Sequence, residues 1–132
     1  MKPTLLPDTS VWVDFLRHRR SYLRDRLAAS DAVGYTQPVL MELLAGARDD
    51  REWELLRRFV TGAVLIPFDS VADFEAAAWI YRHGQGIARR VGQLDCLILA
   101  VAQRSEATLV TSDSGQAALA QRLGMDVRLL AS

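Results

Sequence analysis

Residues 4–16 read TLLPDTSVWVDFL, in which a short apolar run leads into polar residues and then into apolar residues at helical spacing. The run from Thr4 to Pro7 is compatible with a β-strand, and the polar residues after it are of the kind that cap helices. The helix predicted next passes through Val11 to Leu16. This order of strand, cap and helix predicts the repeating unit of an α/β fold.

The same order recurs near the other end of the chain, where TLVT at residues 108–111 is followed by the cap Ser112-Asp113-Ser114. Between them, the sequence predicts further short strands and helices, including a helical hairpin and a buried central helix that begins at Asp95. Short strands that alternate with helices predict an α/β/α fold, with a mostly parallel central sheet flanked by helices in a single domain over residues 1–132. The other predicted strands are 32–35, 64–67 and 125–130, and the other predicted helices are 22–29, 38–46, 50–59 and one that Ser70 caps.

The composition limits the possible functions. Sixteen basic and sixteen acidic residues cancel, so the overall charge gives no long-range attraction to nucleic acid, and any RNA contact must be local. The single cysteine, Cys96, excludes an internal disulfide and a zinc cluster made of cysteines, and it agrees with a reducing compartment. No apolar run approaches the roughly 20 residues that cross a bilayer, and the N-terminus does not resemble a signal peptide. We expect a soluble cytoplasmic protein without a membrane association.

Four carboxylates form the candidate site. Asp8 and Asp113 each follow a strand and precede a helix, so both are expected at the edge formed by the carboxyl ends of the strands. Asp95 begins the buried helix that leads to the second of these strands, and Glu42 lies in a helix among apolar neighbours. Taken singly, the aspartates could be helix caps, and Glu42 could face water or pair with an arginine. Together they predict an acidic pocket, in which carboxylates raise one another's pKa unless cations neutralise them.

Oxygen ligands without other ligand types favour Mg²⁺ or Mn²⁺ over zinc or copper. Such ions suit phosphodiester hydrolysis by a metal-activated water. Ser10, Thr111 and Ser112 stand beside the acids and could orient that water or a ligand, or serve only as helix-cap hydroxyls.

Each of the four acids lies in a distinct segment, and the segments read LPDTSVWVD (6–14), PVLMELLAG (38–46), LDCLILA (94–100) and LVTSD (109–113). In order along the chain they resemble the acidic motifs of PIN-domain ribonucleases, and the similarity is closest to VapC toxins of bacterial toxin–antitoxin modules. The resemblance implies a PIN-like fold and a Mg²⁺- or Mn²⁺-dependent endoribonuclease that cleaves structured RNA such as tRNA or rRNA. Its implied catalytic and metal-binding residues are Asp8, Glu42, Asp95 and Asp113. It also implies a homodimer that a cognate VapB-like antitoxin holds inactive.

The chain departs from this pattern at two positions. Family members often carry a further acid shortly after the last motif, where this sequence has Ser114-Gly115-Gln116. Pro7 stands where a β-branched residue commonly precedes the first acid. The missing acid supports an alternative, a catalytically weak PIN-fold module that binds RNA or antitoxin. A phosphoacceptor receiver domain is disfavoured, because such domains need a lysine late in the chain and the only lysine here is Lys2.

Arginines near the motifs could bind RNA phosphates or pair with acidic side chains of an antitoxin, or they could belong to solvated loops. They are Arg17, Arg19, Arg20, Arg89 and Arg90. Cys96 is expected to be a buried thiol rather than a nucleophile, and the three tryptophans, Trp12, Trp53 and Trp79, are expected to pack. If the core does not cover all of the apolar side chains Trp53, Leu56, Phe59 and Val60, they are expected to mark a groove for a dimer partner or an antitoxin.

Overall fold

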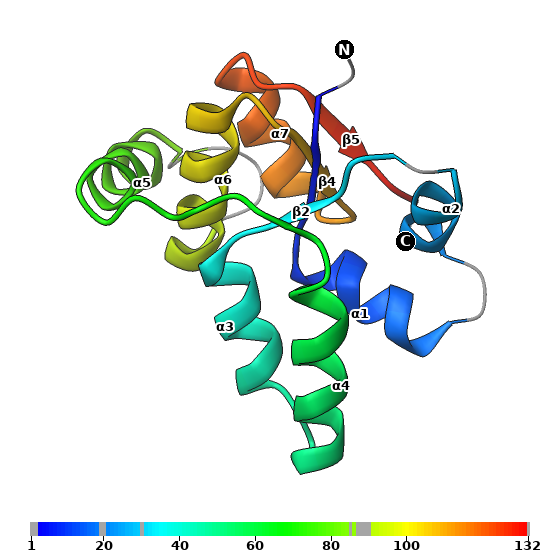
Figure 1. Cartoon of the computed structure of the whole chain (residues 1–132). Helices are drawn as coiled ribbons and strands as arrows, with labels where there is room; N and C mark the ends of the chain where they lie inside the picture. The colour runs from blue at the N-terminus through cyan, green and yellow to red at the C-terminus, as the bar shows by residue number, and fades with distance from the viewer. Residues whose placement is uncertain (1–2, 19–20, 30, 85, 87–90, 132) are drawn as a thin grey trace.

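The computed structural model of the protein describes residues 3–18, 21–29, 31–84, 86 and 91–131 (Figure 1). Short strands alternate with helices along these residues, as the sequence predicts. The strands are β1 (Leu5–Pro7), β2 (Gly34–Tyr35), β3 (Val64–Leu65), β4 (Thr108–Thr111) and β5 (Val127–Leu129). The helices are α1 (Thr9–Arg17), α2 (Tyr22–Ala28), α3 (Gln37–Ala45), α4 (Asp50–Val60), α5 (Ala72–His83), α6 (Gln93–Ser105) and α7 (Ser114–Arg122).

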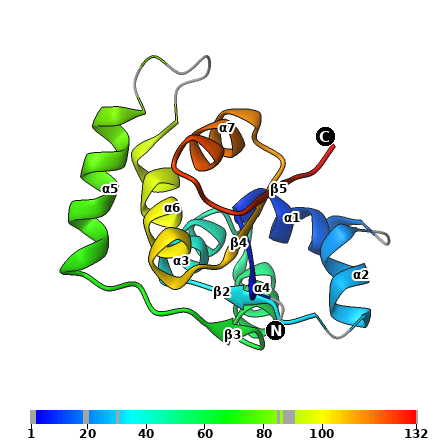
Figure 2. The same ribbon diagram turned by 90° about the horizontal axis from the view of Figure 1, so that it is seen from above.

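The strands lie parallel to one another in every pair that the described residues form. β4 lies between β1 and β5, while β2 pairs with β3, and a bridge between Leu5 and Val33 joins the two sets. Figure 2 shows the strands between α5 and α6 on one side and α1 and α2 on the other. The expected α/β/α arrangement is confirmed. Because the strands are parallel, the first residues after β1 and β4 lie at the same edge of the sheet.

The core is formed where α6 packs beside β4. In α6 the side chains from Ile98 to Ala102 are almost fully buried, as the apolar sequence after Asp95 predicts. Leu6 of β1 stands opposite Leu109 of β4 in the register, and neither is exposed. Cys96 is only 1% exposed, and burial raises the pKa of its thiol to about 11. The expectation of a buried thiol is confirmed.

Two aspartates cap the helices that follow β1 and β4. The Asp8 side chain accepts a hydrogen bond from the Val11 N–H at the start of α1. At the start of α7, the Asp113 side chain accepts from the N–H groups of Gly115 and Gln116. These bonds satisfy amides that have no partner within the helix, which is why each helix begins where it does.

The predicted cap at Ser70 is wrong. The side chain that accepts hydrogen bonds from the first amides near α5 is Asp69, which bonds the N–H groups of Val71 and Ala72. A carboxylate is a stronger acceptor than a hydroxyl, and here it lies one residue earlier than the serine.

A partly buried ion pair anchors the start of α5 to the end of α6. Asp73 is 1% exposed and accepts hydrogen bonds from Nε and Nη2 of Arg104 at 2.9 and 2.8 Å. The same Nη2 donates to the carbonyl of Pro67 at 2.6 Å. One arginine therefore fixes both α5 and the segment between β3 and α5.

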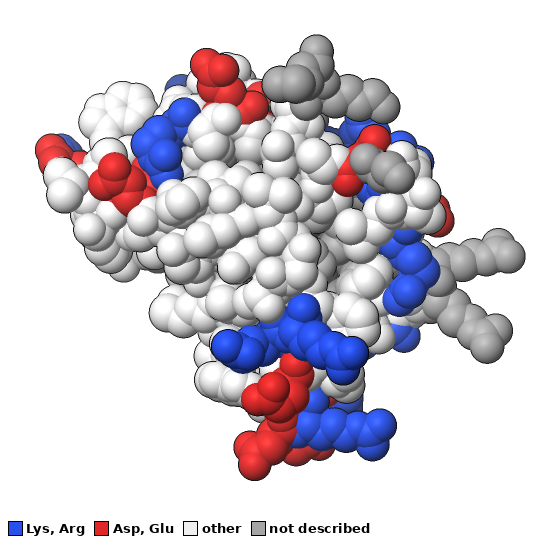
Figure 3. All heavy atoms as spheres, in the orientation of Figure 1, with Lys and Arg blue, Asp and Glu red and all other residues white. Residues whose placement is uncertain are grey.

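The prediction that all three tryptophans pack is right only for Trp12, which is 1% exposed. Trp53 on α4 and Trp79 on α5 are 43% and 53% exposed, and Phe59 and Phe74 on the same two helices are similarly exposed. On the face drawn in Figure 3, uncharged side chains cover the middle, and charged side chains gather at the end where α3 and α4 lie. None of the helices in the described ranges is long and apolar enough to span a membrane.

Candidate active site

The four carboxylates predicted from the sequence line one cavity of about 440 Å³. Asp8 and Asp113 reach it from the ends of β1 and β4, Glu42 from the middle of α3, and Asp95 from the first turn of α6. The other lining residues carry hydroxyl groups and are Thr9, Ser10 and Ser112. No basic side chain lines this cavity among the residues that the structure describes.

Asp8 is the most enclosed of the four acids, with 6% of its surface exposed. Its Oδ1 accepts hydrogen bonds from the Ser10 hydroxyl at 2.7 Å and from the Val11 N–H at 3.2 Å. The Thr111 hydroxyl lies 2.5 Å from its Oδ2. Burial raises the pKa of Asp8 and the nearby Asp113 adds to this, while the hydrogen bonds act in the opposite direction.

Asp113 accepts two backbone hydrogen bonds on one oxygen, from Gly115 at 2.8 Å and from Gln116 at 3.1 Å. Asp8 and Asp113 therefore cap their helices and line the cavity at the same time. Capping and membership of an acidic site are not alternatives for these two residues.

Asp95 and Glu42 do not cap helices in that way. Burial raises the pKa of Asp95 to about 6, and Glu42, Asp113 and Asp8 contribute to the rise, while the Gly92 N–H opposes it as a donor to the carboxylate. The four carboxylates thus lie close enough to repel one another. Glu42 accepts a hydrogen bond from the Thr9 hydroxyl, so its carboxylate is held at the side of the cavity nearest α1.

The hydroxyls expected to support the site divide into two kinds. Ser10 and Ser112 line the cavity, and their hydroxyl oxygens are 3.0 Å apart. Thr111 is fully buried and lies behind Asp8 rather than in the cavity, so it does not face a ligand. Thr9 was not predicted from the sequence. The feature that could have indicated it is a hydroxyl side chain directly after the first acid.

The side chains that line the cavity offer the oxygen ligands that a hard divalent cation prefers. Carboxylate and hydroxyl oxygens are the only polar side-chain atoms among the described residues that line the cavity, and the mutual repulsion of the acids is what such a cation relieves. The described part of the chain holds no group of three His, Cys, Asp or Glu residues already close enough to hold a metal ion. A bound cation would therefore have to draw these side chains together.

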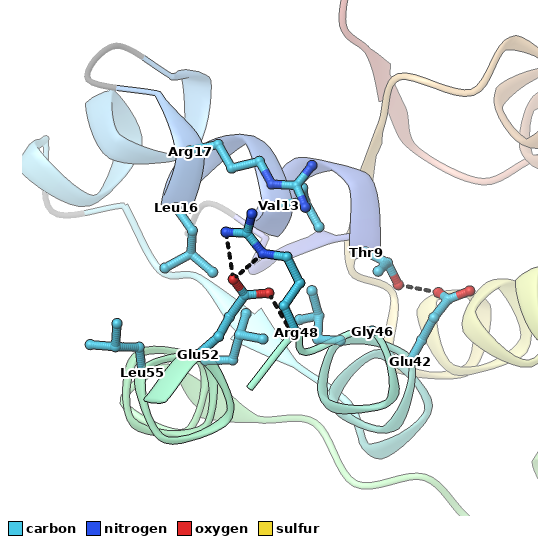
Figure 4. Close-up of a pocket in the computed structure, with 11 residues that line it drawn as sticks. Thr9, Val13, Leu16, Arg17, Glu42, Gly46, Arg48, Glu52 and Leu55 are labelled. Carbon is cyan, nitrogen blue, oxygen red and sulfur yellow. Dashed lines mark hydrogen bonds and ion pairs between the residues drawn. The ribbon is translucent and has the colours of Figure 1, made fainter. Parts of the chain in front are cut away.

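A second cavity, of about 470 Å³, adjoins the first and shares Thr9 and Glu42 with it. Figure 4 shows Arg17 and Arg48 extending into this opening, with the Thr9–Glu42 hydrogen bond at one margin. Arg48 pairs with Glu52 at 2.8 Å. Apolar side chains form the rest of the lining, namely Val13, Leu16, Leu43, Leu55 and Leu56.

Among the arginines predicted to contact RNA or antitoxin, Arg17 lines this second cavity. The other four, Arg19, Arg20, Arg89 and Arg90, lie outside the described residues. Arg48 was not predicted, because it stands in the turn between α3 and α4 with no motif around it.

Comparisons with known proteins agree with the geometry. The PIN domain family profile matches residues 5–122. The chain is 38% identical over 120 residues to Ribonuclease VapC11 of Mycobacterium tuberculosis, covering 83% of this chain and 87% of the relative. A VapC ribonuclease of Mycobacterium bovis matches with the same identity and coverage.

Solved structures of low sequence identity share the fold. A chain of DNA-bound VapBC from Salmonella typhimurium superposes with a TM-score of 0.76 at 19% identity, over 96% of this chain and 98% of that chain. VapBC2 from Rickettsia felis, bound to a DNA fragment from its promoter, gives a TM-score of 0.74 at 17% identity, with the same coverage.

Proposed function

The chain belongs to the PIN-domain family and is a relative of the VapC ribonucleases, and on that basis we propose that it is a metal-dependent endoribonuclease toxin of a type II toxin–antitoxin pair. The observation that carries this proposal is the cavity in which Asp8, Glu42, Asp95 and Asp113 meet without a basic counter-charge from the described residues. We propose structured RNA, such as tRNA or rRNA, as the substrate, and the cytoplasm as the place where it acts.

Mg²⁺ or Mn²⁺ is the proposed cofactor, and the four carboxylates are its proposed ligands. The chemistry that such a cation supplies when bound is neutralisation of charge on the phosphate and activation of water as the nucleophile. Asp8 and Asp113 hold fixed positions because each also caps a helix, while Glu42 and Asp95 reach the cavity from α3 and α6. The hydroxyls of Ser10 and Ser112 face the same space and are suited to orient a water molecule or a phosphate oxygen.

The second cavity is the proposed contact region for the macromolecular partners. Its apolar lining suits the apolar side chains of an antitoxin segment, and Arg17 and Arg48 at its opening suit acidic side chains or RNA phosphates. Because the two cavities share Thr9 and Glu42, an antitoxin seated in the second would obstruct RNA bound at the first.

We further propose that the protein forms a homodimer. The support is exposed apolar surface around α5: Phe74 and Trp79 on the helix are each more than half exposed, as is Val71 just before it. Large apolar side chains exposed on one element are characteristic of protein contacts. Sedimentation velocity of the purified protein, with a Phe74→Ser variant for comparison, tests this: a dimer that the substitution weakens is expected, and a monomer contradicts the proposal.

The decisive experiment on function is cleavage of a total tRNA and rRNA pool by antitoxin-free protein in Mg²⁺, Mn²⁺ or EDTA. Discrete fragments that require the metal and disappear in Asp95→Asn are expected. Asp50→Asn is the matched control, because Asp50 is an exposed acid at the start of α4 and lies outside the cavity. A folded protein that binds the metal but leaves RNA intact would instead be the catalytically weak binding module.

A further inference from the structure

Gln116 is a buried polar residue that the proposed chemistry does not use. It is 1% exposed, belongs to the first turn of α7, and is not among the residues that line the acidic cavity. Its side-chain amide lies 2.9 Å from the hydroxyl of Thr111, and that hydroxyl lies 2.5 Å from Oδ2 of Asp8. A chain of polar contacts therefore runs from α7 through β4 to the first acid of the cavity.

The Thr111 hydroxyl has a single proton, and two acceptors compete for it. Its oxygen faces both Oδ2 of Asp8 and Oε1 of Gln116, and it also accepts the Asp113 N–H at 3.0 Å. A hydroxyl donates one hydrogen bond and accepts two. Since a carboxylate is a stronger acceptor than an amide oxygen, the proton belongs to Asp8. The contact with Gln116 then needs a donor on the glutamine side.

The amide nitrogen of Gln116 can supply that donor. Nε2 is buried and has no hydrogen-bond partner among the described residues. The two ends of a terminal amide are nearly equal in shape, so half a turn of the group brings Nε2 to the Thr111 oxygen and moves Oε1 to the place that Nε2 leaves. Thr111 then donates to Asp8 and accepts from Asp113 and Gln116, which uses its full capacity.

We propose that Gln116 is a positioning residue: its amide N–H directs the Thr111 hydroxyl proton to Asp8 and so holds that carboxylate in orientation for a cation. The proposal rests on the proposed function in so far as Asp8 binds the metal. A carboxylate at position 116 could only accept, so it would compete with Asp8 for the Thr111 proton. The glutamine is therefore suited to this position in a way that a further acid is not.

The first test compares Mn²⁺ affinity, measured from the electron paramagnetic resonance of free Mn²⁺, among variants of the full chain. Gln116→Met removes the amide at similar length, and Gln116→Glu keeps the shape but removes the N–H donor. Residues that orient metal ligands from behind typically change affinity by 10- to 100-fold, so we expect a loss of roughly 10-fold in both variants. Gln121→Met, on the exposed side of the same helix, is the control and should bind as the wild type does. Wild-type affinity in a folded Gln116→Met protein would overturn the proposal.

A double substitution separates positioning from packing. Thr111→Val removes the hydroxyl through which Gln116 acts, so adding Gln116→Met to it should weaken Mn²⁺ binding no further. Losses of affinity that add would show that Gln116 does not act through Thr111.

Nuclear magnetic resonance of the metal-free wild type keeps this inference distinguishable from the proposed function. We expect an Overhauser contact between the Gln116 side-chain N–H protons and the Thr111 side chain, and slower exchange of those protons than of Gln121. Rapid exchange without the contact would overturn the inference whether or not the variants fold. Wild-type protein that shows the contact but binds no Mn²⁺ would overturn the metal-binding role of Asp8 in the proposed function, and with it the cation part of this inference, while the orientation of the Thr111 proton would stand.

Discussion

The Thr9 hydroxyl donates a hydrogen bond to the Glu42 carboxylate, which joins the first turn of α1 to the middle of α3. Thr9 and Glu42 line both cavities, so this contact lies at the boundary between the acidic cavity and the second cavity. The orientation of Glu42 therefore depends on a residue that directly follows another acid of the site.

Replacing this hydroxyl by a methyl group in Thr9→Val should free the Glu42 carboxylate. We expect a loss of about 1 kcal/mol in the free energy of unfolding, because one part-buried hydrogen bond disappears. Mn²⁺ affinity should also fall, while Thr9→Ser, which keeps the hydroxyl, should retain both properties. Urea unfolding and Mn²⁺ titration measure the two effects, and equal behaviour of the valine and serine variants would contradict the expectation.

The pH dependence of stability should carry the signature of Asp95. Folding raises the pKa of Asp95 from 3.8 to about 6, chiefly by burial, so the folded protein holds this proton more tightly than the unfolded chain does. The stabilisation that the protonated form provides is present below the unfolded pKa and is lost as the pH rises through about 6.

In metal-free protein, Asp95→Asn should therefore become more stable relative to the wild type as the pH increases from about 4 to about 7. Because Asp95 is only partly enclosed, solvent screening limits the expected gain to about 1 kcal/mol. Urea unfolding at several pH values, with Asp50→Asn as the control, measures this gain. A difference between wild type and Asp95→Asn that does not change with pH would contradict it.

The pair of Asp73 and Arg104 should matter for stability and not for the chemistry. Asp73 is the buried member of this pair, so Arg104→Ala, which leaves its carboxylate without a counter-charge, should lower the free energy of unfolding by about 3 kcal/mol. The exposed pair of Arg48 and Glu52 offers a contrast, since Arg48→Ala should change stability little. Denaturant unfolding compares the two variants. Similar losses in both would mean that burial is not what distinguishes the pairs.

Leu55 provides a test of the second cavity as the antitoxin site. It lines that cavity and is 40% exposed, so Leu55→Asp should leave the fold intact. We expect the substitution to weaken binding of the cognate antitoxin by about 10-fold or more, which is the usual effect of removing an apolar side chain that anchors an interface. Leu27→Asp is the matched control, because Leu27 is 41% exposed on α2 and does not line the cavity. Calorimetric titration measures both, and an equal effect of the two substitutions would place the antitoxin elsewhere.

The sequence was sufficient to predict the fold and the four acids of the candidate site. A strand followed at once by an aspartate and a helix occurs at Asp8 and at Asp113, and parallel pairing of β1 with β4 brings the two together. Asp95 was found because it begins the buried helix that leads to β4, and Glu42 because it is a charge among apolar neighbours. These signals are local, and they lead to a tertiary arrangement because the parallel sheet has one carboxyl edge.

What the sequence did not predict depends on distances between separate elements. The contact between Thr9 and Glu42 spans 33 residues, and no local pattern indicates it. The exposure of Trp53 and Trp79 was also missed, since helical spacing shows that residues share a face but not whether another element covers that face. Gln116 was noted in the sequence only as the lack of an acid, and its burial against Thr111 became visible in the fold.

The double role of Asp8 and Asp113 has an evolutionary consequence. A descendant released from selection for its chemistry would still need both aspartates to begin α1 and α7, so these two would persist after activity had gone. Glu42 begins no helix by side-chain capping and would be free to change first. In a set of homologous sequences, the identity of the residue at position 42 is therefore a better guide to which lineages keep a working site than the two aspartates that follow the strands.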